Sequence, residues 1–454
     1  MTNTRPPNQR LRALLAEAGW TGQDLARGVN RAGTEAGRKL SYDRTSVAHW
    51  LAGVRPRGPV QALIREVLAR RLSRPLSNAE IGFPAGPLAG RPGAGGAQDD
   101  LWEVDSVAEL TALAGSGADR RRLLSGTGYS LAALVVPRWA QAVGRGTIPV
   151  DAQAVAGTEH AETAEALARV FAQGDAAFGG GHGREALARY LASDLAPRLH
   201  ARMAPRLRRR LFAVAGQLAY LCAFMCFDEE LHGEAQRFYR VSLRLATEAG
   251  GRRAYAVTLR AMSVQARALG HHQEAIDLAE NAAASGTAVA PLSRAFLLGQ
   301  LAVAHAAGRD TPHALTCLRN AERLVDQATS ENGSPLIGAY HLGSLAHQEA
   351  AVRSLLGDRA GAVAALQQSL RLRPATERRS RAITSARLAE LQLSSGHMEE
   401  ATATWHRFLD DYPRLVSLRA TTALFEMRTR LRPHSGNPAV RPLLERAAVA
   451  AAGH

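Results

Sequence analysis

The stretch YDRTSVAHWLAGVRPR, residues 42–57, predicts a short helix with one apolar and one polar side. Asp43 is the expected N-cap, because its carboxylate can accept from the free backbone N–H groups of the first turn. Gly53 stands where a helix needs a left-handed residue to end. The apolar residues between them recur at i, i+3 and i+4 and predict one buried stripe. They are Val47, Trp50 and Leu51.

The opposite face of this helix is expected to point outward. It carries two hydroxyls, an Arg and a His on its first turns, which are side chains that hydrogen-bond base edges and phosphates in a major groove. The candidate DNA-reading residues are Arg44, Thr45, Ser46 and His49.

Three further helices are predicted around this one. Residues 8–19 have leucines on one face and a closing Gly19, and Thr21 with Asp24 three residues later predicts a capped second helix. The segment RAGTEAGRKLSY, from Arg31, is expected to be a long connection. After Arg57, PVQALIREVLARRL predicts a fourth helix that completes the core.

Together these helices resemble the helix-turn-helix of the xenobiotic-response-element (XRE, lambda-repressor-like) regulators. In that family a helix ends in an aromatic residue, a Gly and a basic Pro-containing turn, and the matching stretch here is HWLAGVRPR. The connection from Arg31 is longer than the usual three or four residues. In the resembled family Thr21 and Gln23 would lie against the DNA backbone, and Arg55 and Arg57 are expected to hold phosphates. The long connection, which departs from the family, is expected to make Arg38 and Lys39 a phosphate-touching wing.

Composition and charge agree with a DNA-binding end. The 454 residues predict two or three domains, and 46% apolar with 21% charged residues is typical of a folded chain. The formal net charge is +15. Residues 1–80 hold 14 Lys and Arg against 6 Asp and Glu, which is +8, while the other 374 residues carry +7. This concentration at one end is the footprint expected of a nucleic-acid-binding domain.

Cysteines and apolar segments favour a cytoplasmic protein without a membrane span. The three cysteines show no disulfide pattern, so Cys222 and Cys226 are expected to be buried thiols in a reducing compartment. The apolar run 213–227 is shorter than the roughly 20 residues that span a bilayer and predicts a buried helix. The run from Asp119 imitates a twin-arginine export signal but lies far inside the chain, so we expect a structural segment.

The domain boundaries follow from composition and from repeats. We predict a helix-turn-helix domain at 1–80, a flexible Gly/Pro-rich linker at 81–100, a helical region at 101–215, repeats at 216–415 and capping helices at 416–454. The expected fold class is all-α. The run GGGHGRE, from Gly179, has no preceding strand and predicts a helix–helix turn, not a phosphate loop.

The repeats are found by aligning an Ala that follows each turn. Small or packing residues recur twelve positions before it and four and seven positions after it. The anchors are Ala235, Ala275, Ala314, Ala362 and Ala401. The resulting 34-residue units resemble tetratricopeptide repeats, although none has the early Trp of that family. They are 216–249, 256–289, 295–328, 343–376 and 382–415, with helices at 416–431 and 438–451 expected to cap the array.

Stacked helix pairs form a superhelix that binds peptides, small ligands or partner helices. Candidate ligand contacts on its inner helices, for which solvated polar faces are the alternative, are His305, His341, His347 and Arg353. The basic stretch at 196–210 is either a second nucleic-acid patch or ordinary helix surface. We find no catalytic or metal-binding motif in the sequence, so we expect neither an enzyme nor a cofactor.

The whole arrangement resembles actinobacterial regulators that join a helix-turn-helix to tetratricopeptide repeats. The resemblance implies a cytoplasmic, sequence-specific transcriptional regulator that binds double-stranded DNA, with a repeat domain that dimerises, senses an effector, or both. The alternative is an interaction scaffold whose N-terminal bundle binds a protein.

Overall fold

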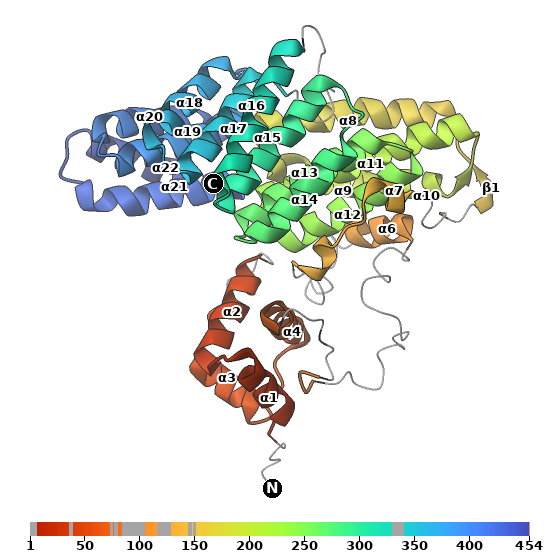
Figure 1. Ribbon diagram of the computed structural model, residues 1–454, viewed down its shortest axis with the longest axis horizontal. Coiled ribbons are helices and arrows are strands. Elements are labelled where there is room, and N and C mark those ends of the chain that lie inside the picture. Colours follow the sequence, from red (N-terminus) through yellow and green to blue (C-terminus); the bar gives the residue numbers. More distant parts are fainter. Residues whose placement is uncertain are drawn as a thin grey trace.

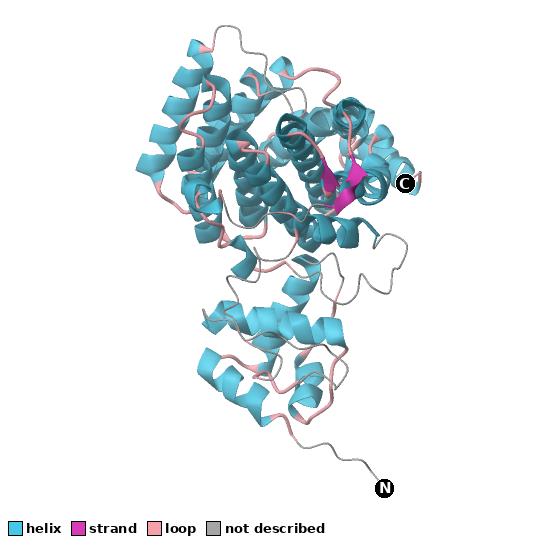
Figure 2. Ribbon diagram, turned by 90° about the vertical axis from the view of Figure 1, so that its right-hand side faces the viewer, coloured by secondary structure: helices cyan, strands magenta, loops and turns pink. Residues whose placement is uncertain are grey.

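The computed structural model describes residues 7–35, 40–72, 76, 80–83, 105–115, 129–143, 148, 151–328 and 340–453. It is all-α, with a small N-terminal bundle below a larger array of helices (Figure 1). The predicted linker lies largely outside the described residues, as does the first half of the export-like run, 119–128. The strands in the described part of the chain are a parallel pair, β1 (Asp151–Val155) and β2 (Ala201–Arg202), shown in magenta in Figure 2.

The N-terminal bundle consists of α1 (Gln9–Ala18), α2 (Gly22–Glu35), α3 (Arg44–Leu51) and α4 (Gly58–Leu72). The predicted apolar faces meet in one core. Gly19 ends α1 in the left-handed conformation, with φ of 64°, as predicted. This core continues past residue 80, since Ile81 and Phe83 are buried in it and the Asn8 amide donates to the Ile81 carbonyl at 3.0 Å. The bundle therefore extends into the segment predicted to be linker.

The predicted connection from Arg31 is wrong in its first part, because α2 continues to Glu35. Ala32 and Gly33 prolong the buried face of the helix, and the Leu40 side chain packs on Gly33 so closely that a Cβ there would lie 2.4 Å from it. Only residues 36–43 separate α2 from α3.

The region before the array is mostly helical, as predicted. Its bounds are α6 (Ser106–Gly115), η3 (Ala132–Leu134), α7 (Trp139–Ala142), α8 (Thr158–Phe178), α9 (Gly180–Tyr190), η4 (Leu191–Leu195) and α10 (Ala196–Leu199). The run GGGHGRE forms the turn between α8 and α9 and the start of α9. Gly180 is required there, since a Cβ would lie 2.6 Å from the Met225 carbonyl oxygen.

The array is a solenoid of five antiparallel helix pairs. The pairs are α11 (Pro205–Asp228) with α12 (His232–Glu248), α13 (Arg252–Ala268) with α14 (His272–Ser285), α15 (Pro291–Ala307) with α16 (Thr311–Gln327), α17 (Leu342–Leu355) with α18 (Arg359–Leu372), and α19 (Arg378–Ser394) with α20 (Met398–Asp411). Two short turns, η5 (Tyr412–Arg414) and η6 (Arg432–His434), and the helices α21 (Leu418–Leu431) and α22 (Val440–Ala452) complete it.

The predicted register positions lie where the paired helices cross. All five anchor alanines are fully buried. Where the register has a serine, its hydroxyl donates to a carbonyl of the partner helix, as from Ser242 to Gly216 at 2.9 Å and from Ser369 to Gly343 at 2.6 Å. Small side chains are needed at these positions because they allow the two backbones to approach.

The two ends of the array are held together by α8 and α9. Arg379 of α19 pairs with Asp175 of α8 at 2.9 Å, and the Val416 N–H donates to the Phe178 carbonyl at 2.7 Å. The Gly180 N–H of α9 donates to Asp228 at the end of α11. The first and last helix pairs therefore share a common support, which closes the superhelix on one side.

One described helix, α11, is long and apolar enough to cross a membrane by length and composition. However, 83% of its most apolar window is buried inside the protein, which is typical of a core helix. Cys222 and Cys226 are fully buried on it, as predicted, and burial together with their mutual contact raises the pKa of the Cys226 thiol.

Candidate nucleic-acid interface

Helix α3 begins with a reciprocal cap. Asp43 accepts from the Ser46 backbone N–H and from the Ser46 hydroxyl, both at 2.8 Å. These hydrogen bonds hold the pKa of Asp43 below its ordinary value, so the carboxylate stays charged at the helix N-terminus, where the helix dipole favours it. The cap fixes the start of a helix that has only eight residues.

The buried side of α3 packs on the rest of the bundle. Val47 and Trp50 are buried, and Trp50 meets Tyr42 edge-to-face with ring centroids 5.1 Å apart. Leu51, predicted in the same stripe, is half-buried. Asn30 of α2 fixes the chain just before α3. Its side-chain amide donates to the Tyr42 carbonyl and accepts from the Tyr42 N–H, each at 2.8 Å.

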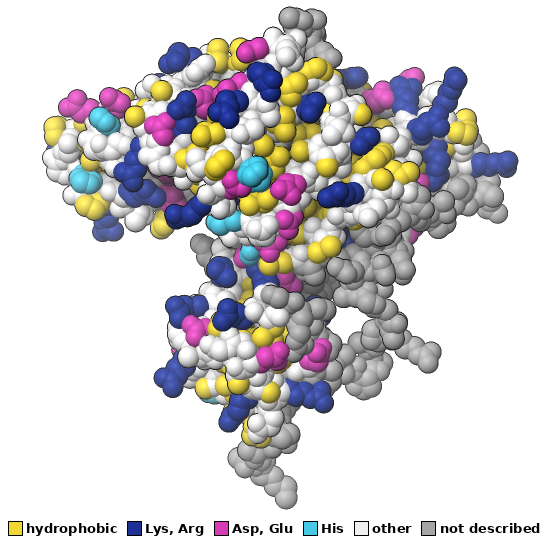
Figure 3. Space-filling view, in the orientation of Figure 1, with side chains coloured by type: hydrophobic (Ala, Val, Ile, Leu, Met, Phe, Trp, Pro, Cys, Tyr) yellow, Lys and Arg dark blue, Asp and Glu magenta, His cyan; other side chains and the backbone are white. Residues whose placement is uncertain are grey.

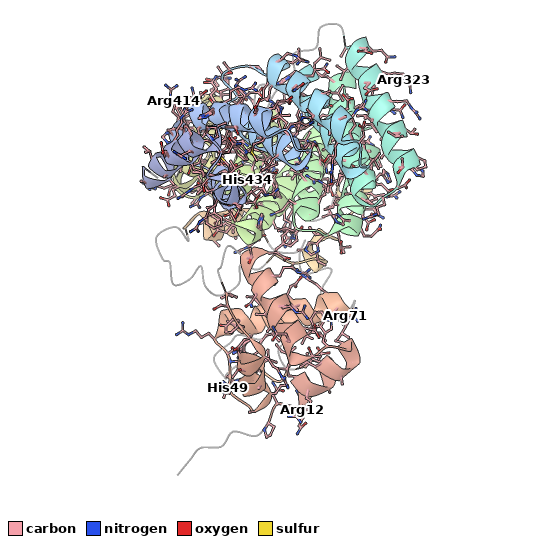
Figure 4. All side chains as sticks on the ribbon, turned by 90° about the vertical axis from the view of Figure 1, so that its left-hand side faces the viewer. Arg12, His49, Arg71, Arg323, Arg414 and His434 are labelled. Carbon is pink, nitrogen blue, oxygen red and sulfur yellow. The ribbon has the colours of Figure 1, made fainter. Side chains whose placement is uncertain are left out.

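Three of the four predicted reading residues, Arg44, Thr45 and His49, are exposed together on α3. Figure 4 shows His49 on the N-terminal bundle, away from the helical array. Ser46 is half-buried, and its hydroxyl proton is directed to Asp43. Ser46 therefore contributes to the cap, a role that its spacing from Asp43 also fits.

Four of the five predicted backbone-contacting residues are exposed around α3. They are Thr21, Gln23, Arg55 and Arg57. Thr21 caps α2 as predicted, since its hydroxyl donates to Asp24 at 2.6 Å and accepts from the Asp24 N–H at 3.3 Å. Lys39 lies outside the described residues. Figure 3 shows Lys and Arg side chains on several sides of the N-terminal bundle, the body that carries α3.

The bundle docks on the array through a network that sequence reasoning missed. Glu35, at the end of α2, is buried between Arg70 of α4 at 2.6 Å and His271, before α14, at 3.5 Å. Tyr129 stacks on the His271 ring, and its carbonyl accepts from Arg70 at 2.6 Å. We call these four residues and Glu66, which accepts from Arg70 and from the Leu131 N–H, the docking cluster.

Residues 129–137 form the strap that carries this contact to the array. The backbone of Ser130 makes two hydrogen bonds to the Gln236 side chain, and the Pro137 carbonyl accepts from the Tyr255 hydroxyl at 2.6 Å. These residues form the second half of the export-like run, but nothing in the sequence marks their contacts with the bundle and the array, because those partners lie between 59 and 145 positions away.

Of the predicted ligand contacts on the inner helices, His347 lies against α19, where the Thr384 hydroxyl is 3.2 Å from its Nδ1. His341 caps α17 and binds Glu377, His305 stacks on His313, and Arg353 pairs with Glu349 and Asp358. In the basic stretch 196–210, Arg210 is held by Glu165 at 2.7 Å and Arg208 lies over the Phe212 ring. These two pairings belong to ordinary helix packing.

Comparison with known proteins gives one match to a family. Residues 11–84 match the family described as the SP15 N-terminal domain. No curated protein matches the chain. The matched segment includes Ile81 and Phe83, which among the described residues are the last ones buried in the N-terminal core.

Proposed function

We propose that the protein is a sequence-specific, DNA-binding transcriptional regulator of the cytoplasm. Its N-terminal bundle would act as a helix-turn-helix of the kind seen in XRE-family regulators, with α3 in the major groove. Its helix pairs, which resemble tetratricopeptide repeats, would dimerise the protein, sense an effector, or both.

The observation that carries this proposal is the polar face of α3. Arg44, Thr45 and His49 are exposed on a capped helix whose other side is anchored in a core. The docking cluster, by contrast, uses the ends of α2 and α4, so the array is attached at a different part of the bundle (Figure 1). A short helix held this way presents its side chains to a groove at little entropic cost.

In this proposal the exposed residues have two roles. Arg44, Thr45 and His49 contact base edges, which determine sequence, whereas Thr21, Gln23, Arg55 and Arg57 contact phosphates, which determine position. Ser46 holds the cap of α3 and, in this proposal, contacts DNA only at the edge of the interface. A dimer would favour an operator with inverted repeats.

The test is DNA binding at fixed salt by the full-length protein, on an operator recovered by genomic footprinting. Arg44→Ala and His49→Ala are each expected to weaken specific binding by about 1–3 kcal/mol, roughly 5- to 150-fold, with little change on unrelated DNA. Arg57→Ala should weaken both equally and lower the salt slope by about 1.

Arg323→Ala is the matched control, since Arg323 is exposed on α16 of the array (Figure 4). If specific binding survives both α3 substitutions, the exposed face of α3 does not read DNA. Binding of a protein partner that is insensitive to salt would instead favour the scaffold function.

A further inference from the structure

Helix α21, near the end of the array, carries exposed apolar residues on the side away from the core. Leu418 and Phe425 are seven residues apart, which places them on one face of the helix two turns apart, and they are 41% and 68% exposed. The other side of α21 is buried, since Leu424 and Met427 belong to the core of the last helices. We call Leu418 and Phe425 the α21 stripe. Figure 1 shows α21 at the edge of the array, beside α22.

The stripe is unusual because this protein otherwise keeps its aromatic rings from solvent. Among the Phe, Tyr and Trp side chains that the structure describes, only Phe425 and Phe178 are exposed. Phe178 lies near the N-terminal end of the stripe, because its carbonyl accepts from the N–H of Val416, an exposed residue two positions before Leu418. Single exposed apolar residues are ordinary, whereas apolar residues gathered on one surface mark a contact site.

The charged residues beside the stripe suit a second copy of the same helix. Glu426 and Arg428 are both exposed, and at about 100° per residue they fall on opposite flanks of Phe425. When two parallel α21 helices pair face to face about a two-fold axis, each stripe residue meets its own symmetry mate. The opposite flanks then also meet, so Arg428 of each copy lies beside Glu426 of the other. Within one chain Glu426 has Arg430 at 4.0 Å, an exposed and therefore weak pair.

We propose that the α21 stripe pairs with the same stripe of a second copy, with the two α21 helices parallel. Arg432, at the next position of the seven-residue spacing, follows α21 in η6, so the apolar contact is short. Stable complexes bury about 800 Å² per partner, and this short contact should therefore give a dimer that dissociates at micromolar concentrations. That this pairing joins two DNA-binding heads rests on the proposed function; the pairing itself does not.

Sedimentation equilibrium of the full chain without DNA tests the pairing. The unmodified chain is expected to form dimers as its concentration rises through the micromolar range. Phe425→Glu should weaken the dimer by about thirtyfold or more, because it replaces an aromatic anchor by a charge at the centre of the contact. Val449→Glu is the matched control, since Val449 is 76% exposed on α22, outside the stripe, and should leave dimerisation unchanged. Both variants should keep the Tm of the unmodified chain.

An exchange of charges tests the parallel arrangement. Glu426→Arg alone and Arg428→Glu alone should each weaken the dimer by about fivefold, because each sets two pairs of like charges across the axis. The double exchange, Glu426→Arg with Arg428→Glu, makes the facing charges opposite again and should recover most of the lost affinity. An antiparallel pairing, or apolar adhesion without a defined register, predicts no recovery.

The proposal is overturned if the unmodified chain stays monomeric at tens of micromolar, or if Phe425→Glu dimerises as tightly as the unmodified chain. In the first case a different protein would have to cover the stripe, and in the second the copies would meet through another surface. A double exchange that recovers nothing would overturn the parallel arrangement. Because DNA is absent from every measurement, these failures leave the proposal for α3 untouched.

Discussion

Asn30 controls the position of α3 from outside it. Its side chain makes two hydrogen bonds to the Tyr42 backbone, two residues before the first residue of α3. Asn30→Ala would leave a half-buried N–H and C=O without partners and should destabilise the bundle by about 1–3 kcal/mol. If α3 reads DNA as proposed, Asn30→Ala should weaken specific binding although Asn30 lies on α2, outside the proposed reading face. Specific binding is measured together with urea unfolding of the full chain.

Thr34→Ala is the control, since Thr34 is exposed on the same helix and its hydroxyl only bonds back to the Asn30 carbonyl. A positioning role for Asn30 predicts that the loss falls on specific binding more than on binding to unrelated DNA. Equal specific affinities for Asn30→Ala and the unmodified protein would contradict it.

Two histidines of the array should make its stability depend on pH. Burial lowers the pKa of His232 to about 4, and burial with nearby arginines lowers that of His347 to about 3. The unfolded chain binds protons at both sites below about pH 6.5, whereas the folded chain does so only near pH 4 and 3. Stability should therefore fall as the pH is lowered from about 6.5 towards 4.

Asp175 has the opposite effect on stability, because burial raises its pKa to about 6. Below that pH the folded chain holds a proton on Asp175 that the unfolded chain releases. It offsets one of the two histidines between about pH 4 and 6. The Tm measured from pH 7 to 5 should therefore fall less in His347→Gln than in the unmodified chain. If the Tm of the two proteins falls by the same amount between pH 7 and 5, His347 binds its proton in the folded protein as readily as in the unfolded chain.

At the scale of elements, one buried ion-pair group joins the two ends of the superhelix, beside the backbone hydrogen bonds described above. Arg379 joins α19 to Asp175 of α8 and to Asp228 of α11, and it also lies over the Phe224 ring. Arg379→Met would leave the buried Asp175 without a cation and Asp228 with Arg419 alone, and breaking a buried pair from one side costs about 3–5 kcal/mol. We expect a loss of that size in urea unfolding, with α8 and α9 the first helices to gain hydrogen exchange.

The double substitution Arg379→Met with Asp175→Asn separates charge from packing. Because it removes one uncompensated carboxylate, it should recover part of the stability lost in the single variant. Arg371→Met, on the exposed surface of α18, should have little effect. If the single variant is as stable as the unmodified chain, the closure does not depend on this group.

The helix pairs were predictable from sequence, and their closure was not. Each anchor alanine is buried where two helices within about 34 residues cross, so the constraint repeats at a fixed spacing. Asp175 and Arg379 are 204 residues apart and occur once, so neither spacing nor composition marks them as partners.

The candidate reading face was likewise predictable only where its determinants are local in sequence. Caps and the apolar stripe of α3 are local, so Asp43, Val47 and Trp50 could be placed from spacing alone. The structure adds two contacts: the hydrogen bond from the Ser46 hydroxyl to Asp43, and the hydrogen bonds of Asn30 to the Tyr42 backbone. They depend on side-chain rotamers and on contacts between helices. The end of α2 was misplaced because Gly33 reads as a helix breaker, although Leu40 packs on it.

For the whole molecule, the docking cluster determines how the bundle is oriented on the array. Burial by itself would raise the pKa of Glu35, but the nearby His271 at 3.5 Å and the charge and hydrogen bond of Arg70 outweigh it, so the pKa lies below its ordinary value. A carboxylate of lowered pKa stabilises the contact above its unfolded pKa, about 4.3, and loses that effect as the pH falls through its folded value.

Glu35→Gln removes the charge that Arg70 and His271 share, so at pH 7 the bundle should detach from the array without unfolding. The radius of gyration from small-angle scattering should rise, while the helical content stays constant. The unmodified chain should show the same expansion only in acid, below about pH 4. Glu399→Gln, on the exposed start of α20, is the control. If the two domains set the spacing of paired half-sites, Glu35→Gln should also bind operators of altered spacing almost as well as the original one. Unchanged scattering for Glu35→Gln would mean that the strap at 129–137 holds the domains without this carboxylate.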